Sequence, residues 1–312
     1  MKIGLIAGGG TDEAQTTLTS AECITSAAKS LGHTTAIIEL GRERGADDLA
    51  WVSAVRACDL AFPLIAGLEG LLQALQLPYI GSDPTAAGIG ADKGLFNDLV
   101  RAWGYGKTPY VRLAPWESLD KVDRAGLSYP VFVKPARLGA SIGIARVETR
   151  ADLEQAVVFA KQHDHHVLVE EGVLGREVEV AAIVGEEVLV SQAGVLVLPD
   201  GHLWHSVKAK RSYGRLVTDH KLSPKIVNQL KTITVELARR ADVSCGIRVD
   251  YFLTSTDAIL VGEINCVPGQ GTISNFPYLF EKSGIDRSMQ LSAQIQAALW
   301  NRARAAAARV RF

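Results

Sequence analysis

The stretch from Cys245 to Gly269, CGIRVDYFLTSTDAILVGEINCVPG, constrains the fold most, because it places charged side chains on otherwise apolar strands. Arg248 and Asp250 are two residues apart in an extended run, so their side chains lie on the same side of the strand. After a polar turn, a second apolar run reaches Glu263 and Asn265, which share one face in the same way. If the two runs pair as a hairpin, these polar side chains converge.

The converging side chains predict a divalent metal site. Asp250, Glu263 and Asn265 offer two carboxylates and an amide carbonyl, which are hard oxygen ligands that Mg²⁺ accepts when water or phosphate oxygens complete its octahedron. The alternative is a surface hairpin with ordinary solvated charges, because this spacing alone is not specific. Pro268 and Gly269 follow directly and favour a rigid turn that brings backbone close to a ligand.

Length and composition indicate a globular protein of two or three packed units, since 312 residues exceed the roughly 100 to 150 of a common domain. A net charge of -1 gives no reason to expect a nucleic-acid partner. No apolar run approaches the roughly 18 residues that cross a bilayer, and the N-terminal MKIGLIAGGG is predicted to be a strand rather than a signal peptide. Four cysteines without CxxC spacing argue against structural zinc and disulfides, so we expect a cytoplasmic protein with free thiols.

The first 85 residues predict a doubly wound parallel α/β domain. An apolar strand over 2–7 leads through three glycines to a helical pattern over 18–31, and further strands are expected over 34–40 and 60–65. The triple glycine is not a complete dinucleotide-binding motif, so close packing at the strand end is the alternative to nucleotide binding.

A second group of signals points to phosphate. A helix pair is expected around Lys93, a linker over 111–122, and a strand over 130–135 that carries Lys134. The small-residue loop 137–143 follows, and its backbone N–H groups together with a lysine can hold phosphate oxygens. The alternative is a solvated lysine at a hairpin.

Two further segments carry charge. Glu177 and Glu179 share one face of a predicted strand and could bind ribose hydroxyls or a metal, unless that face is simply exposed. The basic segment 201–214 reads as a loop that could close over an anionic ligand. Ser223 and Pro224 are expected to start a helix that runs to Arg240, and a terminal helix over 286–312 should end in a solvated Ala/Arg tail.

Taken together, the chain resembles the ATP-grasp superfamily, and within it the D-alanine–D-alanine ligases. The matching stretches, in the family's order, are GGGTDE, LPYIGSD, ADKGLFNDL, YPVFVKPARLGASIG, VLVEEGVLGREVEV, GIRVDYF and GEINCVPGQGTISNFP. The resemblance implies an α/β fold of the ATP-grasp type. It comprises an N-terminal doubly wound parallel domain over 1–85, a central α+β domain over 86–175 and a C-terminal α+β domain over 176–312, with ATP held between the last two.

The resemblance also implies roles for particular residues. Lys93 and Lys134 look like the lysines that hold ATP phosphates, and Arg248 with the backbone of Gly269 looks like the pair that stabilises the oxyanion. Lys210 falls on a lysine of the mobile ω-loop that closes the site in this family. Further nucleotide contacts are implied for Ala140, Ser141, Glu170, Glu171, Val173, Glu177 and Asn265, metal ligation for Asp250, Glu263 and Asn265, and substrate contacts for Glu13, Arg211, Ser274 and Asn275.

The implied activity is ATP-dependent ligation of two amino acids through an acyl phosphate, with two Mg²⁺ ions, replaceable by Mn²⁺, in a homodimer without nucleic-acid or membrane partners. Three departures affect the amino-acid end of the site. The family's HGxxGEDG loop is shortened to residues 63–67, its phosphate-loop serine is Ala140, and its ω-loop tyrosine is Arg211. A guanidinium only donates hydrogen bonds, so it cannot replace the lost hydroxyls as an acceptor. A ligase or cyclo-ligase for another amino-acid-like substrate is therefore one alternative, and a silent nucleotide-binding regulator is another.

Overall fold

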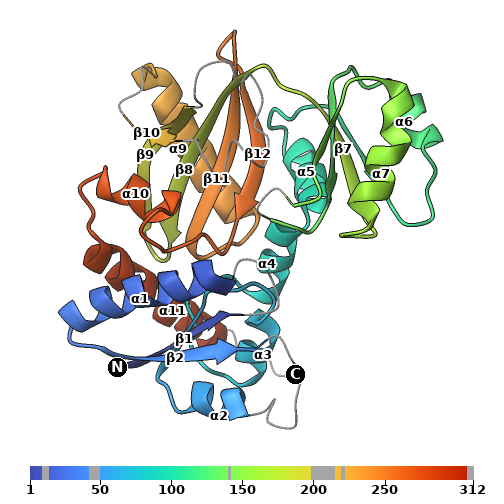
Figure 1. The fold of residues 1–312 in the computed structure, drawn as a ribbon. Coiled ribbons are helices and arrows are strands. Elements are labelled where there is room, and N and C mark those ends of the chain that lie inside the picture. Colours follow the sequence, from blue (N-terminus) through green and yellow to red (C-terminus); the bar gives the residue numbers. More distant parts are fainter. Residues whose placement is uncertain (9–13, 42–49, 140–141, 198–214, 219–221, 308–312) are drawn as a thin grey trace.

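The computed structural model describes residues 1–8, 14–41, 50–139, 142–197, 215–218 and 222–307. These residues form three units, each built around its own sheet (Figure 1). Within them, no helix is both long and apolar enough to cross a membrane. The four cysteines are free thiols, as expected.

The N-terminal unit is a parallel sheet of three strands in the order β2-β1-β3, with helices on both faces. Its elements are β1 (Lys2–Gly8), α1 (Ala14–Ser30), β2 (Thr34–Leu40), α2 (Ala50–Arg56), β3 (Leu60–Pro63) and α3 (Glu69–Ala74). Successive β1 side chains point to opposite faces, so Leu5 packs in the core with α1 while Ile6 packs in the core with α2 and α3. The predicted doubly wound arrangement is confirmed.

The last helix of the chain, α11 (Arg287–Ala307), completes the N-terminal unit instead of projecting into solvent. Leu291 and Ile295 are buried in the same core as Leu5 and α1. Its end, from Arg302 to Ala307, is exposed, as expected for the tail. The helix also contacts β8 and β11, so it joins the first and last units of the chain.

The central unit is an antiparallel sheet in the order β4-β7-β5-β6. Its elements are α4 (Pro84–Ala91), α5 (Lys93–Ala102), β4 (Tyr110–Leu113), α6 (Asp120–Ala125), β5 (Val131–Pro135), β6 (Ala145–Val147), α7 (Leu153–Lys161) and β7 (Val167–Glu171). Asp92 ends α4 and caps α5, since its Oδ1 accepts from the Leu95 N–H at 2.9 Å. This cap places Lys93 at the first residue of α5. The linker expected over 111–122 instead contains β4 and the start of α6.

The C-terminal unit is a five-stranded antiparallel sheet in the order β10-β9-β8-β11-β12. Its elements are β8 (Gly175–Val184), β9 (Val188–Val197), β10 (Arg215–Val217), α9 (Pro224–Arg240), β11 (Cys245–Thr254), β12 (Ile259–Asn265) and α10 (Asn275–Glu281). Val178 and Val180 face the core under α9, whereas Ala181 and Ile183 pack against α10 on the other face. Ser223 caps α9 as predicted.

The predicted β11–β12 hairpin is confirmed, and it contains a β-bulge. Asp250 pairs with Glu263 but Tyr251 pairs with Val261, so Gly262 is the extra residue. A Cβ at Gly262 would lie 2.7 Å from the Asp250 carbonyl oxygen, which explains the glycine. The bulge lets Val261 enter the α9 core while Glu263 points to the opposite face. A regular strand would have put both on one side.

Candidate active site

One face of the C-terminal sheet carries a row of charged side chains. Asp250 on β11 lies directly between Glu179 on β8 and Glu263 on β12, and Arg248 pairs with Asn265. Residues directly opposite in antiparallel strands project to the same side. Asp250 is 4% exposed and β11 is flanked on both sides, so the alternative of a solvated surface hairpin is wrong.

Arg248 is held by two carboxylates. Its Nε and Nη2 donate to the two oxygens of Asp250 at 2.7 and 2.8 Å, and Nε lies 3.2 Å from Glu179 Oε2. Burial opposes the charged guanidinium, but the carboxylates of Asp250 and Glu179 outweigh it and raise the pKa of Arg248. The site therefore contains a fixed cation.

Three acids on this face lie close enough together to share a metal ion. Glu177, Glu179 and Asp250 each offer one oxygen within 4.8 Å of the others, and all three are buried. The exposed-face alternative for Glu177 and Glu179 is therefore wrong. Of the three ligands predicted from the sequence, this group contains Asp250. On β12, Glu263 pairs with Asp250 and Asn265 pairs with Arg248.

Lys93 connects the central unit to this face. Its Nζ donates to the Leu138 carbonyl at 2.7 Å and lies 3.6 Å from Glu263 Oε2. A lysine that was predicted to bind phosphate and an acid that was predicted to bind metal thus share one space between the two units.

The second predicted lysine belongs to a buried charge cluster around Glu170. Glu170 Oε2 pairs with Lys134, while Oε1 lies 3.3 Å from Lys107 Nζ and accepts from Asn97 Nδ2 at 2.7 Å. Burial alone would raise the pKa of Glu170, but the two lysines and these hydrogen bonds lower it to about 2. Lys134 is 17% exposed, so the alternative of a solvated hairpin lysine is wrong.

The residues after Glu170 connect β7 to β8. Glu171 Oε1 accepts from the Ser128 N–H at 2.7 Å, and its backbone N–H donates to the Pro109 carbonyl at 3.0 Å. Val173 is half-buried in the connection that follows. In the pairing of β5 with β7, Glu171 lies opposite Val131, and Lys134 lies opposite Leu168 further back along β7.

The loop after β12 leads into α10. Asn265 Oδ1 accepts from the Val267 N–H at 3.0 Å, and Ser274 Oγ accepts from the Gly271 N–H at 3.0 Å. Asn275 starts α10, and its Nδ2 donates to Glu179 Oε1 at 3.1 Å. A Cβ on Gly269 would lie 2.7 Å from Ser274 Oγ, so a side chain at this position would require the Ser274 hydroxyl to move. The predicted substrate residues Ser274 and Asn275 therefore adjoin the acidic face.

Five predicted site residues lie outside the described residues. They are Glu13, Ala140, Ser141, Lys210 and Arg211. Their roles remain predictions from the sequence.

Two residues that hold the site together were not predicted from the sequence. Lys107 is buried beside Glu170, and its Nζ also donates to the Gly262 carbonyl of the bulge at 2.8 Å. Arg287 at the start of α11 donates to the carbonyls of Gln270 and Gly271 at 2.6 and 3.1 Å and so fixes the loop before α10. The roles of both residues depend on contacts with other elements, some of them distant in the sequence. Hydrophobic periodicity along the sequence therefore cannot predict these roles.

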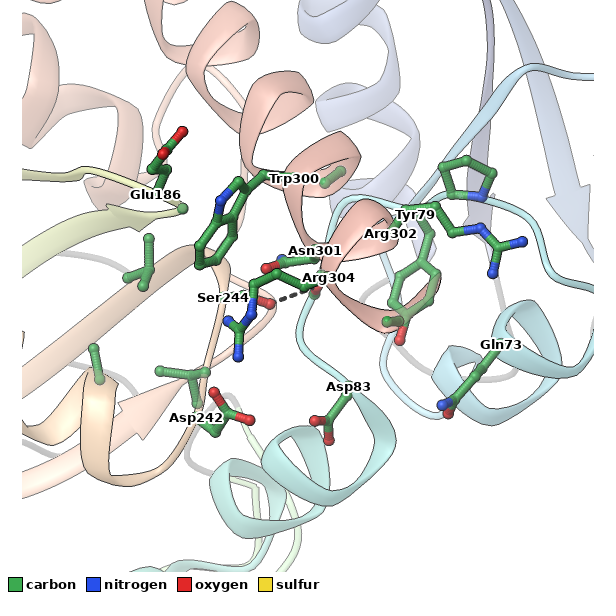
Figure 2. Close-up of a pocket in the computed structure, with 18 of the residues that line it drawn as sticks. Gln73, Tyr79, Asp83, Glu186, Asp242, Ser244, Trp300, Asn301, Arg302 and Arg304 are labelled. Atoms are coloured by element: carbon green, nitrogen blue, oxygen red, sulfur yellow. Dashed lines mark hydrogen bonds between the residues drawn. The ribbon is translucent and has the colours of Figure 1, made fainter. Parts of the chain in front are cut away.

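A separate cavity of about 500 Å³ lies where the segment 73–83, the β8–β9 turn, the connection from α9 to β11 and α11 meet (Figure 2). Asp83, Asp242 and Trp300 are among its lining residues. None of the predicted site residues that the structure describes lines it. The cavity is therefore distinct from the charged face.

The chain has the ATP-grasp fold, which it shares with solved ligases. The solved D-alanine–D-alanine ligase of Coxiella burnetii matches with a TM-score of 0.86 and 23% identity, over 99% of this chain and 96% of that chain. The D-Ala:D-Ser ligase VanG of Enterococcus faecalis matches with a TM-score of 0.82 and 23% identity, over 95% of this chain and 99% of that chain.

The sequence comparisons define the family within that class. A family model described as the D-ala D-ala ligase C-terminus matches residues 104–296. A D-alanine–D-alanine ligase of Mycobacterium sp. (strain KMS) is 34% identical over 264 residues, which is 78% of this chain and 70% of that protein. The chain therefore belongs to the D-alanine–D-alanine ligase family, and it is an ATP-dependent ligase that forms a C–N bond.

Proposed function

We propose that this ligase converts the carboxylate of one amino acid to an acyl phosphate and joins it to the amine of a second amino acid. The observation that carries the proposal is that Lys93 Nζ lies 3.6 Å from Glu263 Oε2, next to the Arg248–Asp250 ion pair. Phosphoryl transfer is mostly positioning and charge neutralisation, so cations facing a metal-binding acid supply what the reaction requires.

The donors present fit a hard divalent cation. Asp250, Glu263 and Asn265 are oxygen donors on adjacent strands, and Asn265 Oδ1 keeps a lone pair beyond its bond from Val267. Bound Mg²⁺ would neutralise phosphate charge. We assign two Mg²⁺ ions to this face, because Glu179 extends the acid row, and expect Mn²⁺ to substitute through the same oxygens.

The nucleotide would occupy the space between the central and C-terminal units. Lys93 and Lys134 hold its phosphates in this proposal, and the backbone of Ala140 and Ser141 covers them. Glu170 and the backbone of Glu171 and Val173 face the adenine, while Glu177 binds the ribose. The burial of Glu177 on the same face as Asp250 supports its role.

The two chemical steps follow from these positions. A substrate carboxylate oxygen attacks the γ-phosphorus of ATP, and ADP leaves. The second amine then attacks the acyl carbon, the C–N bond forms, and inorganic phosphate leaves as the C–O bond breaks. The amine loses its proton, and the phosphate can accept it. Negative charge on the carbonyl oxygen is stabilised by the Arg248 guanidinium and the Gly269 backbone N–H.

The amino acids and the assembly complete the proposal. Glu13 binds the ammonium of the first amino acid, Ser274 and Asn275 contact the second, and Lys210 and Arg211 belong to the closing loop. A cytoplasmic homodimer rests on the family resemblance.

The direct test is Mg²⁺-dependent ADP release with pairs of amino acids, with and without hydroxylamine. Hydroxylamine traps an acyl phosphate as a hydroxamate and needs no second amino acid. We expect hydroxamate with the first substrate alone and dipeptide with both. Absence of ADP release and hydroxamate with every amino acid tested would refute the proposal and favour a silent regulator.

A second candidate concerns the acceptor. Glu179 Oε1 accepts from Asn275 Nδ2 at 3.1 Å, so the amide expected to contact an acceptor carboxylate already faces a buried carboxylate. Like charges repel strongly at a buried site. This favours an acceptor without a free α-carboxylate. Comparing D-alaninamide with D-alanine as the acceptor tests this, and a clear preference for D-alanine would contradict it.

A further inference from the structure

Lys107 is a buried lysine that the reaction described above does not use. It lies between α5 and β4, and its side chain is only 2% exposed. Burial lowers the pKa of Lys107, while the carboxylate of Glu170 opposes that effect. A buried ammonium is costly unless it is paired, so its contacts must compensate for its desolvation.

Those contacts join the two units that would enclose ATP. Lys107 Nζ lies 3.3 Å from Glu170 Oε1 on β7 of the central unit and donates to the Gly262 carbonyl on β12 at 2.8 Å. The adjacent Gly106 carbonyl accepts from the Val261 N–H at 2.8 Å. α5 and β12 lie side by side, and these bonds add to that contact (Figure 1).

The charges of the cluster determine how much positive charge is available to attract a phosphate. Glu170 contacts Lys107 with one oxygen and Lys134 with the other. Two lysines and one carboxylate leave a net charge of +1 in a buried group. If Lys107 were neutral, Glu170 would cancel the charge of Lys134, and little attraction for a triphosphate would remain.

We propose that Lys107 is the fixed counter-charge of Glu170. By neutralising Glu170, Lys107 keeps the positive charge of Lys134 available for the phosphates of ATP. Lys107 is therefore a positioning residue that acts through Glu170 and Lys134. The proposal rests on the proposed function, because it takes Lys134 as a phosphate-binding residue. It predicts that Lys107 matters for the phosphates and not for the nucleoside.

The experiment compares the affinities of the full-length chain for ATP and for adenosine in Lys107→Met, Lys107→Arg and the double variant Lys107→Met/Glu170→Gln. Lys107→Met should weaken ATP binding by at least about tenfold, which is 1.4 kcal/mol, and change adenosine binding by less than about threefold. Lys107→Arg should retain ATP affinity. The exposed Lys121→Met removes one lysine elsewhere on the central unit and should leave both affinities unchanged.

The double variant provides the decisive comparison, since it also applies if Lys107→Met alone does not fold. Removing both charges frees Lys134. The ATP affinity of the double variant, divided by its adenosine affinity so that any effect of Glu170→Gln on the adenine contact cancels, should stay within about threefold of the wild-type ratio. Equal losses of ATP and adenosine affinity in Lys107→Met would overturn the inference. So would a ratio of ATP to adenosine affinity in the double variant that falls well below the wild-type ratio. Unchanged ATP affinity in Lys107→Met would also overturn it. A wild-type protein that binds no ATP would instead refute the proposed function, and the inference with it.

Discussion

Substitution of Arg248 should separate the two chemical steps. The guanidinium lies between Asp250 and Glu179, which are 4% and 2% exposed. Arg248→Ala leaves these carboxylates without their cation, and breaking a buried ion pair costs about 3–5 kcal/mol. That is a large part of the roughly 5–15 kcal/mol that stabilises a typical domain. The variant to use is therefore Arg248→Lys, which keeps the charge.

Arg248→Lys removes the bidentate hydrogen bond to Asp250, at 2.7 and 2.8 Å. A lysine ammonium also cannot present a donor to the substrate in the same position and orientation. Loss of one donor to an oxyanion reduces turnover by about 10²–10³-fold, or roughly 2.7–4 kcal/mol. We expect that loss in dipeptide formation. The affinity for ATP should stay within about threefold, because the phosphate-binding lysines are untouched.

The assay is a single-turnover measurement of ADP, hydroxamate and dipeptide on the same preparation, together with ATP affinity by titration. The melting temperature, compared with that of Arg248→Ala, controls for folding. An Arg248→Lys variant that loses ATP affinity as much as turnover would refute the assignment of Arg248 to the oxyanion. Equal loss of ADP formation and dipeptide formation would place Arg248 in the first step instead.

Three further predictions follow from the same region. The pKa of Glu170 is lowered to about 2 from an ordinary 4.5, so this carboxylate stabilises the fold above about pH 4.5, and its contribution is lost as the pH falls toward 2. Glu170→Gln should reduce the dependence of the free energy of unfolding on pH in that range. An unchanged pH dependence would count against the ion-pair cluster. Gly262→Ala forces a Cβ against the Asp250 carbonyl and should cost about 1–3 kcal/mol in urea unfolding; Gly70→Ala, with open space around it, should not destabilise the chain. EDTA should abolish ADP release, and Glu263→Gln should raise the Mg²⁺ concentration for half-maximal activity by about tenfold or more; an unchanged Mg²⁺ requirement would remove Glu263 from the ligand set.

Much of the fold could be predicted because its signals are local. β2 was predicted over Thr34–Leu40 and is found there, and the Ser223 cap of α9 acts within one helical turn. β4 was missed because its four residues are too short to show alternation between flanking turns. The terminal helix was predicted, but its packing against α1 in the N-terminal core was not, since that contact joins segments far apart in the sequence.

For the site, the sequence by itself determined which side chains share a strand face. Arg248 with Asp250, and Glu177 with Glu179, follow from the period of two along a strand, which needs no partner. Tertiary structure alone decided that β8 lies beside β11, which brings Glu179 to Arg248, and that the Gly262 bulge turns Val261 into the core. It also buried Lys107 against Glu170. The physical reason is that strand order, bulges and buried ion pairs are settled by packing between segments far apart in sequence, and no local pattern encodes that packing.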